Sequence, residues 1–332
     1  MPVLSRRAAA HLAALAALLP AAPASLRAQD AAAGWPGRPV TLLVPFAAGG
    51  SNDVVARLLT PALEQRFGQP FVVENRPGGG GSVGMGQVAR ARPDGLSFLV
   101  SSASNHVFHP LISPDLGYDV REALAGVAML VDVPNVVVAN PALGVRTVPE
   151  LIAKVRAMPR GISFGSSGVG TSNHLAGELF RLRTGLDMTH VPYRGGGPAL
   201  QDVLAGMVPL AFMNLPTVLP QAREGRLQIL AVCTAERVPS QPEIPTVAEQ
   251  GVADYAVRSW TGVFAPRGTP RPVLERFSAA LKEGLEQPEV KRRLVELGSE
   301  PIWTDPDATD RFVREEYERW APVVKTAGVT RD

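Results

Sequence analysis

Cysteine and histidine, which build most zinc sites and many catalytic sites, are scarce in this chain of 332 residues. It has one cysteine, Cys233, and five histidines. A single cysteine cannot form an intramolecular disulfide, and because Cys233 follows the apolar stretch 230–232 we expect a buried thiol. His106 and His109 lie three residues apart, but no acidic residue or cysteine beside them completes a metal-binding set. The sequence therefore predicts no metal site, and a loop or surface position for both histidines.

The chain also lacks a basic cluster. Residues 1–28 contain three arginines and no acidic residue, so the rest of the chain has 30 basic residues against 31 acidic ones. A nucleic-acid-binding domain is expected to carry a basic patch or stripe. We therefore expect no nucleic-acid partner.

The apolar run near the start is too short for a membrane span. Residues 8–19 give 12 positions, whereas a bilayer needs about 20. This run follows Arg6 and Arg7 and precedes the small, proline-rich stretch 20–28, an order typical of a secretory signal. We expect cleavage near Ala28 and a periplasmic location. The arginine pair leaves both the general secretory route and the twin-arginine route open.

Nucleotide and nucleophile motifs are absent or misplaced. The stretch Gly79–Gly84 has dinucleotide-loop spacing, but Pro77 interrupts the path from the preceding strand, and no acidic residue ends the predicted strand 96–100 to hold a ribose. The Gly-Ser-Ser-Gly stretch that starts at Gly165 is one residue out of register with a hydrolase elbow. We predict no cofactor and no catalytic residue.

Short apolar runs alternate with helix-length amphipathic segments. We expect strands at 41–44, 71–73, 96–100, 162–164, 188–191, 210–213 and 227–233, and helices at 53–67, 83–91, 149–157, 172–183, 198–205, 218–223, 271–285, 288–297 and 306–321. This alternation predicts βαβ units around a mostly parallel sheet. The strands are continuously apolar, as expected when helices cover both faces. The fold class is therefore α/β.

Two extended segments, 135–140 and 260–266, interrupt this alternation. A second set of strands and helices lies between them, and a helical tail follows. We predict two lobes, each a mostly parallel sheet flanked by helices: 35–138 with 260–332, and 139–259. Because the chain passes between the lobes twice, the two extended segments form a hinge.

The turn between the first strand and the first helix, residues 45–53, is the strongest candidate binding feature. Gly49 and Gly50 permit close approach of the backbone, and the Ser-Asn-Asp sequence that follows can cap the helix. Free N–H groups at a helix start attract an anion without a basic side chain, and ligands of open α/β sheets bind beyond the carboxyl ends of strands. The alternative is an ordinary capped turn.

Two similar turns follow in the predicted second lobe. Residues 164–174 offer three glycines, four hydroxyls and an amide between a strand and a helix. Residues 192–198 again join a strand to a helix, which Pro198 is suited to begin. Three such turns indicate a shared cleft between the lobes. His174 has two roles open, a base or a residue that caps its helix or lines the cleft.

Longer stretches around these turns form a recognisable pattern. They read VPFAAGGSND at 44–53, VVENRPGGGG at 72–81, HVPYRGGGPAL at 190–200, IPTVAEQG at 244–251 and WTGVFAPRGTP at 260–270. In this order they resemble the tripartite tricarboxylate transporter receptor family, also called the Bug family. The resemblance covers essentially the whole chain after the leader. It implies a two-lobed, periplasmic-binding-protein-like fold of type II, in a monomer that closes on a mono-, di- or tricarboxylate and delivers it to membrane permease subunits.

The resemblance also implies a site built from backbone amides and hydroxyls of two turns. Carried over residue by residue, it points to Ala48, Gly49, Gly50 and Ser51 in the first lobe and to Ser166, Gly170, Thr171 and Asn173 in the second. Further candidates for the wall are Phe46, Ser101, Ser102, His174, Tyr193 and Asn214. Asp53 cannot favourably face a carboxylate, so it caps its own helix or meets a ligand ammonium. Arg194 is a candidate partner for a second carboxylate, with a salt bridge at the rim as the alternative.

Two departures from the family pattern leave the ligand open. Pro209 stands where family members commonly carry an acid, and residues 101–109 match poorly. Two other functions also stay open: a ligand sensor for a signalling partner, and a secreted enzyme that acts on a small carboxylic acid. An enzyme needs a positioned nucleophile or base, which the turns do not display. We therefore predict a binding protein rather than an enzyme.

Overall fold

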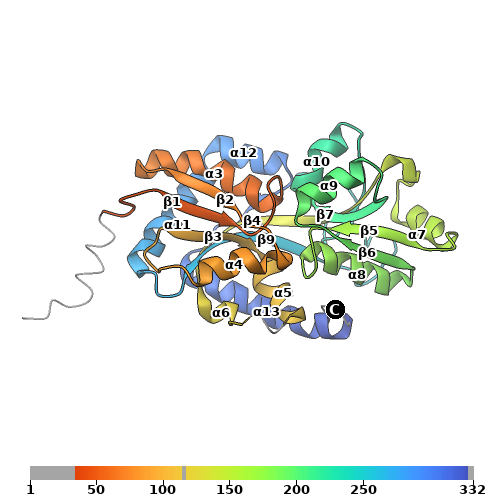
Figure 1. Ribbon diagram of the computed structural model, residues 1–332. Coiled ribbons are helices and arrows are strands. Elements are labelled where there is room, and N and C mark those ends of the chain that lie inside the picture. The colour runs from red at the N-terminus through yellow and green to blue at the C-terminus, as the bar shows by residue number, and fades with distance from the viewer. Residues whose placement is uncertain (1–33, 114–116, 328–332) are drawn as a thin grey trace, which may run out of the picture.

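A mixed β-sheet runs through both halves of the molecule (Figure 1). The computed structural model describes residues 34–113 and 117–327, so the predicted signal at 1–28 and its cleavage near Ala28 lie outside the described residues. The strands are β1 (Val40–Val44), β2 (Phe71–Asn75), β3 (Ser97–Ser102), β4 (Leu124–Ala139), β5 (Ile162–Ser166), β6 (Met188–Pro192), β7 (Leu210–Asn214), β8 (Gln228–Val232), β9 (Arg258–Pro266) and β10 (Glu300–Pro301). Their order is β2-β1-β3-β9-β4-β7-β5-β6, with β8 and β10 also paired to β4.

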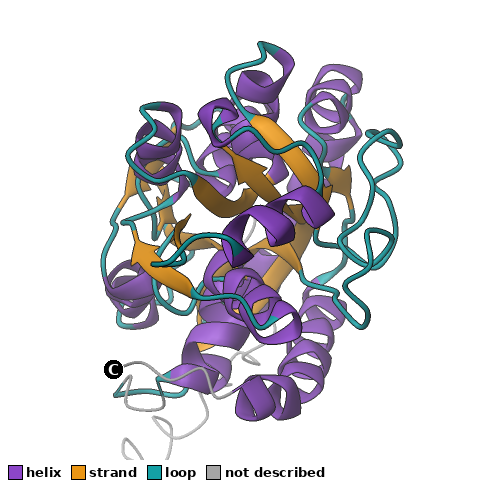
Figure 2. Ribbon diagram, turned by 90° about the vertical axis from the view of Figure 1, so that its right-hand side faces the viewer, coloured by secondary structure: helices purple, strands orange, loops and turns teal. Residues whose placement is uncertain are grey.

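Helices cover both sides of these strands, as Figure 2 shows. They are α3 (Ser51–Phe67), α4 (Ser82–Ala89), α5 (His109–Ile112), α6 (Val120–Ala123), α7 (Val148–Arg156), α8 (Ser172–Thr184), α9 (Gly196–Leu204), α10 (Leu215–Arg223), α11 (Arg271–Glu286), α12 (Pro288–Glu296) and α13 (Pro306–Ala327). Short 3₁₀ turns occupy Gly79–Gly81 and Pro141–Leu143, and Ser104–Phe108 is π-helical. No helix within the described ranges is long and apolar enough to cross a membrane.

The parallel pairings lie on the outer parts of the sheet and the antiparallel ones at its centre. Strand β1 pairs in parallel with β2 and β3, and β5 with β6 and β7. The central strands β4 and β9 pair antiparallel with each other and with their other neighbours. We call the half that contains β1 the first lobe and the half that contains β5 the second lobe. The residue boundaries predicted for the lobes stay a prediction.

Strand β4 is longer than the extended segment 135–140 expected from the sequence. Its 16 residues are buried almost throughout. Residues 124–134 pair with β9, and residues 135–139 pair with β7 and β8. The sequence did not predict residues 124–134 as a strand, because Asp132 and Pro134 are unusual in a central strand. An ion pair of 2.7 Å to Arg258 on β9 holds the Asp132 carboxylate.

The two chain crossings are bonded to each other. The N–H of Cys233 donates to the carbonyl oxygen of Asn135 over 2.7 Å, and the N–H of Val257 donates to that of Cys233 over 2.7 Å. These bonds join β4 to the segment that leads into β9. The segments that cross between the lobes are therefore hydrogen-bonded to each other, and their role as a hinge stays a prediction.

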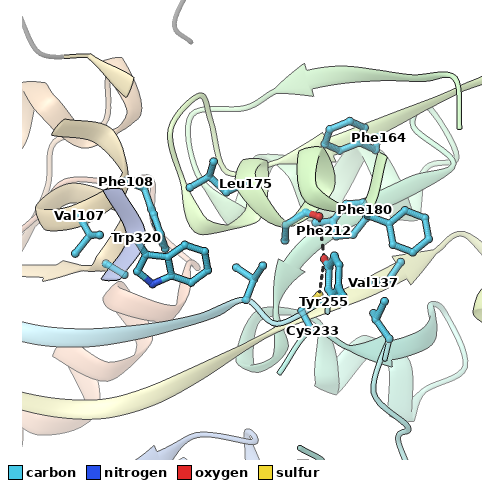
Figure 3. Close-up of a cluster of buried hydrophobic side chains, with 14 of the residues drawn as sticks. Val107, Phe108, Val137, Phe164, Leu175, Phe180, Phe212, Cys233, Tyr255 and Trp320 are labelled. Atoms are coloured by element: carbon cyan, nitrogen blue, oxygen red, sulfur yellow. Dashed lines mark hydrogen bonds between the residues drawn. The ribbon is translucent and has the colours of Figure 1, made fainter. Parts of the chain in front are cut away.

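One buried cluster extends across both lobes (Figure 3). Phe108 and Trp320 belong to the first lobe and its C-terminal helix, and Leu175 and Phe180 to the second. Cys233 lies in this cluster and is fully buried, as predicted; the hydroxyl of Tyr255 donates to its Sγ over 3.5 Å. Burial raises the pKa of this thiol to about 12, so Cys233 acts as a small apolar group.

The expected loop or surface position of His106 and His109 is wrong. Both side chains are buried, at 2% and 1% exposure. His106 stacks on Phe264 with 3.7 Å between the ring centroids, and burial lowers its pKa to about 3. A neutral imidazole packs as a flat ring, which is why His106 fits inside the fold. Among residues 34–113 and 117–327, no group of three or more His, Cys, Asp or Glu could hold a metal ion.

Candidate functional site

The first turn joins β1 to α3 and is held by the carboxylate of Asp53. Gly49 has a φ of 82°, a conformation that favours glycine, and its N–H donates to Asp53 Oδ2 over 3.0 Å. Arg57, one helical turn further, donates from Nε to Asp53 Oδ1 over 3.0 Å. Burial raises the pKa of Asp53, but the hydrogen bonds from Arg57 and Gly49 outweigh this effect and hold it below its usual value. Asp53 is thus ionised and occupied at its own helix start.

The second turn joins β5 to α8 and is held by neutral groups. Thr171 caps α8, and its Oγ1 accepts from the N–H of His174 over 3.2 Å. His174 Nδ1 in turn accepts from the N–H of Gly170. Ser166 Oγ lies 2.6 Å from His190 Nε2, and the two histidine rings stack 3.9 Å apart. A hydroxyl, a cap and a stacked histidine pair therefore fix this turn.

The third turn, between β6 and α9, touches the first turn directly. The N–H of Ala47 donates to the carbonyl oxygen of Arg194 over 3.2 Å. A Cβ on Gly195 would lie 3.0 Å from the nitrogen of Ala47, and one on Gly197 would lie 2.5 Å from the carbonyl oxygen of Ala48. Glycine at these positions lets the two lobes meet backbone to backbone.

A hollow with about 410 Å³ of empty space, part of it open to solvent, lies between these turns. It is lined by Phe46, Gly50, Ser51, Asn52, Asp53, Ser102, Ser104, Ser167, Thr171, Asn173, Gly196, Asn214, Thr217 and Ser259. The starts of α3, α8, α9 and α10 all contribute to this wall. Because the first N–H groups of a helix have no acceptor inside it, several positive helix ends face one space.

The wall is rich in hydrogen-bond donors but has no basic side chain. Its single charged residue, Asp53, is engaged by Arg57. Two amide groups, Asn52 Nδ2 from the first lobe and Asn173 Nδ2 from the second, are buried and make no hydrogen bond within the described part of the chain. The oxygens of both amides are already used, by Thr261 and Ser167. A buried donor without a partner is costly, so these two amides indicate a site for an acceptor.

The structure brings half of the sequence-predicted site residues to this hollow. They are Phe46, Gly50, Ser51, Asp53, Ser102, Thr171, Asn173 and Asn214. Their roles in ligand contact stay predictions. Among them, Asp53 accepts from the N–H of Gly49 in the turn before α3, whereas the cap position itself, Gly50, has no side-chain hydrogen bond.

The other predicted residues lie elsewhere. Ala48 and Gly49 are exposed, and the N–H of Gly49 is taken by Asp53. Ser101 is buried behind the wall, where its Oγ donates to Asn105. Beneath the second turn, Gly170 bonds to His174 and Ser166 bonds to His190, so these residues support the wall without lining it. Tyr193 and Arg194 line a different hollow.

Several residues of the wall were not predicted from the sequence. Asn52, Ser167 and Gly196 sit in the three turns already singled out. Thr217 lies in the first turn of α10, which the sequence placed three residues too late; the Pro216 near its start was the available signal. Ser104 and Ser259 carry no local signal, because the π-helical segment and the start of β9 reach the hollow only through the fold.

Comparison with known proteins agrees with this architecture. The family model described as tripartite tricarboxylate transporter family receptor matches residues 55–329. Protein BugT of Bordetella pertussis is 38% identical over 308 residues, which cover 92% of this chain and 94% of BugT.

Two solved structures from Rhodopseudomonas palustris are also similar. One, determined with adipate, is 38% identical with a TM-score of 0.86 and covers 89% of this chain and 99% of its own. The other, MatC with bound malate, is 33% identical with a TM-score of 0.82 and covers 87% and 100%. The periplasmic-binding-protein-like α/β fold predicted from the sequence is confirmed by these likenesses. The chain belongs to the tripartite tricarboxylate transporter receptor family.

Proposed function

We propose that this protein is a periplasmic solute-binding receptor that captures a small carboxylate between its lobes and delivers it to a tripartite tricarboxylate-type membrane transporter. The observation that carries the proposal is the donor-rich, cation-free wall where the starts of α3, α8, α9 and α10 meet. Helix starts favour anions. The unpartnered amides of Asn52 and Asn173 supply one further donor from each lobe.

Neutral donors suffice for useful affinity. A hydrogen bond to a charged group contributes roughly 1.5–3 kcal/mol, and a micromolar Kd needs a net binding free energy of about 8 kcal/mol. Several such bonds, less the cost of ordering the ligand and closing the lobes, reach this range. The hollow between the turns is small, which favours a small ligand. Adipate and malate, seen with the two similar proteins, are of this class.

The wall favours a binding role over catalysis. It contains no histidine, cysteine or lysine, and its carboxylate is ionised and held by Arg57. The serine and threonine hydroxyls therefore have no base beside them to activate them. Delivery to a transporter and the periplasmic location rest on membership of the receptor family.

The test uses a Gly50→Val variant and a panel of carboxylates. Gly50 caps α3 with a φ of −78°, so a side chain there is tolerated by the backbone but points toward Ala47 and Gly196, 3.6 and 3.9 Å from a Cβ. We expect the added methyl groups to block closure and weaken binding at least about a hundredfold, a loss of about 2.7 kcal/mol, with far-UV circular dichroism unchanged. Isothermal titration calorimetry measures the affinity.

Gly37→Val is the matched control, because Gly37 is exposed and far from the turns, with only ordinary contact at its Cβ. It should bind like the wild type. Equal affinity of Gly50→Val and wild type would place the ligand elsewhere. Conversion of any bound carboxylate, detected by product analysis, would show an enzyme instead of a receptor.

A further inference from the structure

A second hollow lies beside the first. It has about 630 Å³ of empty space, part of it open to solvent, and its walls come from Phe46, the glycine loop 78–81, His109, the stretch Ser167–Val169 and the third turn Pro192–Arg194. Phe46 and Ser167 belong to the walls of both hollows. The two hollows are therefore neighbours, with Phe46 and Ser167 at the boundary between them.

The second hollow is shaped by glycine. Gly78, Gly79, Gly80 and Gly81 all have positive φ values, from 56° to 141°. A Cβ on Gly80 would lie 2.4 Å from the carbonyl oxygen of Val169 in the other lobe, and the carbonyl of Gly80 accepts from Asn105 Nδ2 over 3.2 Å. The loop is thus fixed against the second lobe, and bulkier residues would fill the space or separate the lobes.

The charge of the second hollow differs from that of the first. Arg194 is exposed, lines this hollow and makes no ion pair within residues 34–113 and 117–327. No acidic residue lines it, and the neighbouring Tyr193 hydroxyl is already bonded to Asp202 at 2.7 Å. The first hollow has neutral donors and one acid paired with Arg57, whereas the second has one guanidinium, on Arg194, that no acidic residue of its wall opposes, beside the buried His109.

We infer that the second hollow is an outer subsite that binds the far carboxylate of an elongated dicarboxylate, with Arg194 as the residue that selects for it. The near carboxylate occupies the cation-free hollow, and the carbon chain passes Phe46. A planar guanidinium matches a carboxylate in geometry and charge. This inference rests on the proposed function, since it assigns a second group of the same ligand.

The experiment measures affinity by calorimetry for unbranched dicarboxylates of increasing length and for monocarboxylates of matched length. Wild-type protein should prefer a dicarboxylate, with an optimum at one chain length. Arg194→Gln should weaken binding of that dicarboxylate roughly tenfold, the low end for a bond to a charged group, because Arg194 is exposed. It should leave the monocarboxylates unchanged. Arg194→Lys, which keeps the charge, should recover part of the loss.

Arg183→Gln is the matched control. Arg183 is also exposed and lies near the end of α8, outside both hollows, so this variant makes the same change in net charge. If Arg194→Gln and Arg183→Gln weaken dicarboxylate binding equally, the preference for dicarboxylates comes from long-range charge, and the inference is overturned. Equal affinity of wild type for both acid classes, or a dicarboxylate preference that Arg194→Gln leaves intact, would overturn it too. If neither class binds wild type, the proposed function itself fails, and the inference fails with it.

Discussion

The first and second turns line one hollow but are built from opposite chemistry. The first turn has a glycine cap without a side-chain bond and depends on an ionised acid, Asp53, held by Arg57. The second turn has a side-chain cap, Thr171, and depends on neutral groups, among them the stacked His174 and His190. The side chain of Arg57 is 53% exposed, whereas that of His174 is 8% exposed.

This difference follows from where each turn lies. Charge is tolerated near the surface but is penalised by burial. Arg57 reaches solvent, so an ion pair can hold the first turn, and this pair also cancels the one negative charge on the wall. Beneath the second turn, burial keeps the pKa values of both histidines below their usual range. Both arrangements leave neutral donors facing the hollow, which is what an anion site without basic side chains needs.

The largest effect should come from placing a negative charge on either side of the hollow. Asn52→Asp and Asn173→Asp change one atom each, remove a buried donor and add a like charge beside the expected carboxylate. The lost hydrogen bond and the added repulsion together should weaken carboxylate binding at least about a hundredfold for each variant. Calorimetry measures the two losses, and their comparison shows whether both turns contact the ligand.

Gln201→Glu is the charge-matched control, since Gln201 is exposed on α9 outside the wall. It should bind as the wild type does. A loss confined to one of the two asparagine variants would mean that one turn alone holds the ligand. Tighter binding in both would indicate a cationic ligand and contradict the proposed function.

The groups that hold the two turns should differ in how much they stabilise the fold and in how salt affects them. Asp53→Ala removes charge-assisted bonds to Arg57 and Gly49 and should lower the unfolding free energy by about 1–2 kcal/mol. This loss is smaller than for a fully buried ion pair, because the side chain of Arg57 is half exposed. Thr171→Ala removes a cap and should cost about 1 kcal/mol. Urea unfolding at low and high salt distinguishes them: salt screens only the ion pair, so the difference between Asp53→Ala and wild type should shrink. Equal salt responses of the two variants would refute the contrast.

The sequence predicted the turns because their signals are local. Glycines after an apolar strand and hydroxyls at a helix start follow from backbone chemistry within a few residues. Pro198 marked the region correctly, but α9 begins two residues earlier, at Gly196. The α/β order and the two crossings follow from periodicity for the same reason. Which residues of a turn face the ligand depends on how the rest of the chain packs around them. Gly49 and Gly170 carried the right signal, but their N–H groups are used by Asp53 and His174.

The rest of the wall depends on segments that meet only in the folded chain. Ser104 is in a π-helical segment where its Oγ accepts from the N–H of Ser172 of the other lobe. Ser259 is placed by the register of β9 against β4. The burial of His106 also depends on the fold, because no periodic pattern in the sequence around it indicates a ring packed against Phe264. Long-range packing, and not local preference, decides these positions.

The smallest expected effect is a difference in pH response between the two turns. Burial, with a minor contribution from the charge of His174, lowers the pKa of His190 to about 3, and burial lowers that of His174 against the opposing effect of Glu178. In the unfolded chain both titrate near 6.5, so below this pH the unfolded state binds protons that the native state does not, and stability falls as the pH falls. The lowered pKa of Asp53 has its effect only below the usual value of 3.8.

Between pH 6.5 and 3.8, acid should therefore weaken the second turn and spare the first. His190→Gln removes one titrating ring while keeping a group that can bond to Ser166. As the pH is lowered through this window, its unfolding free energy should fall less steeply than that of the wild type. A residual slope should come from His174 and from His106, whose pKa values burial also lowers. Asp53→Ala should keep the wild-type slope between pH 6.5 and 3.8, because the Asp53 carboxylate of the wild type is ionised in both the folded and the unfolded state in this window. If His190→Gln keeps the full slope, His190 is already protonated in the native protein, and the neutral stack is not what holds the second turn.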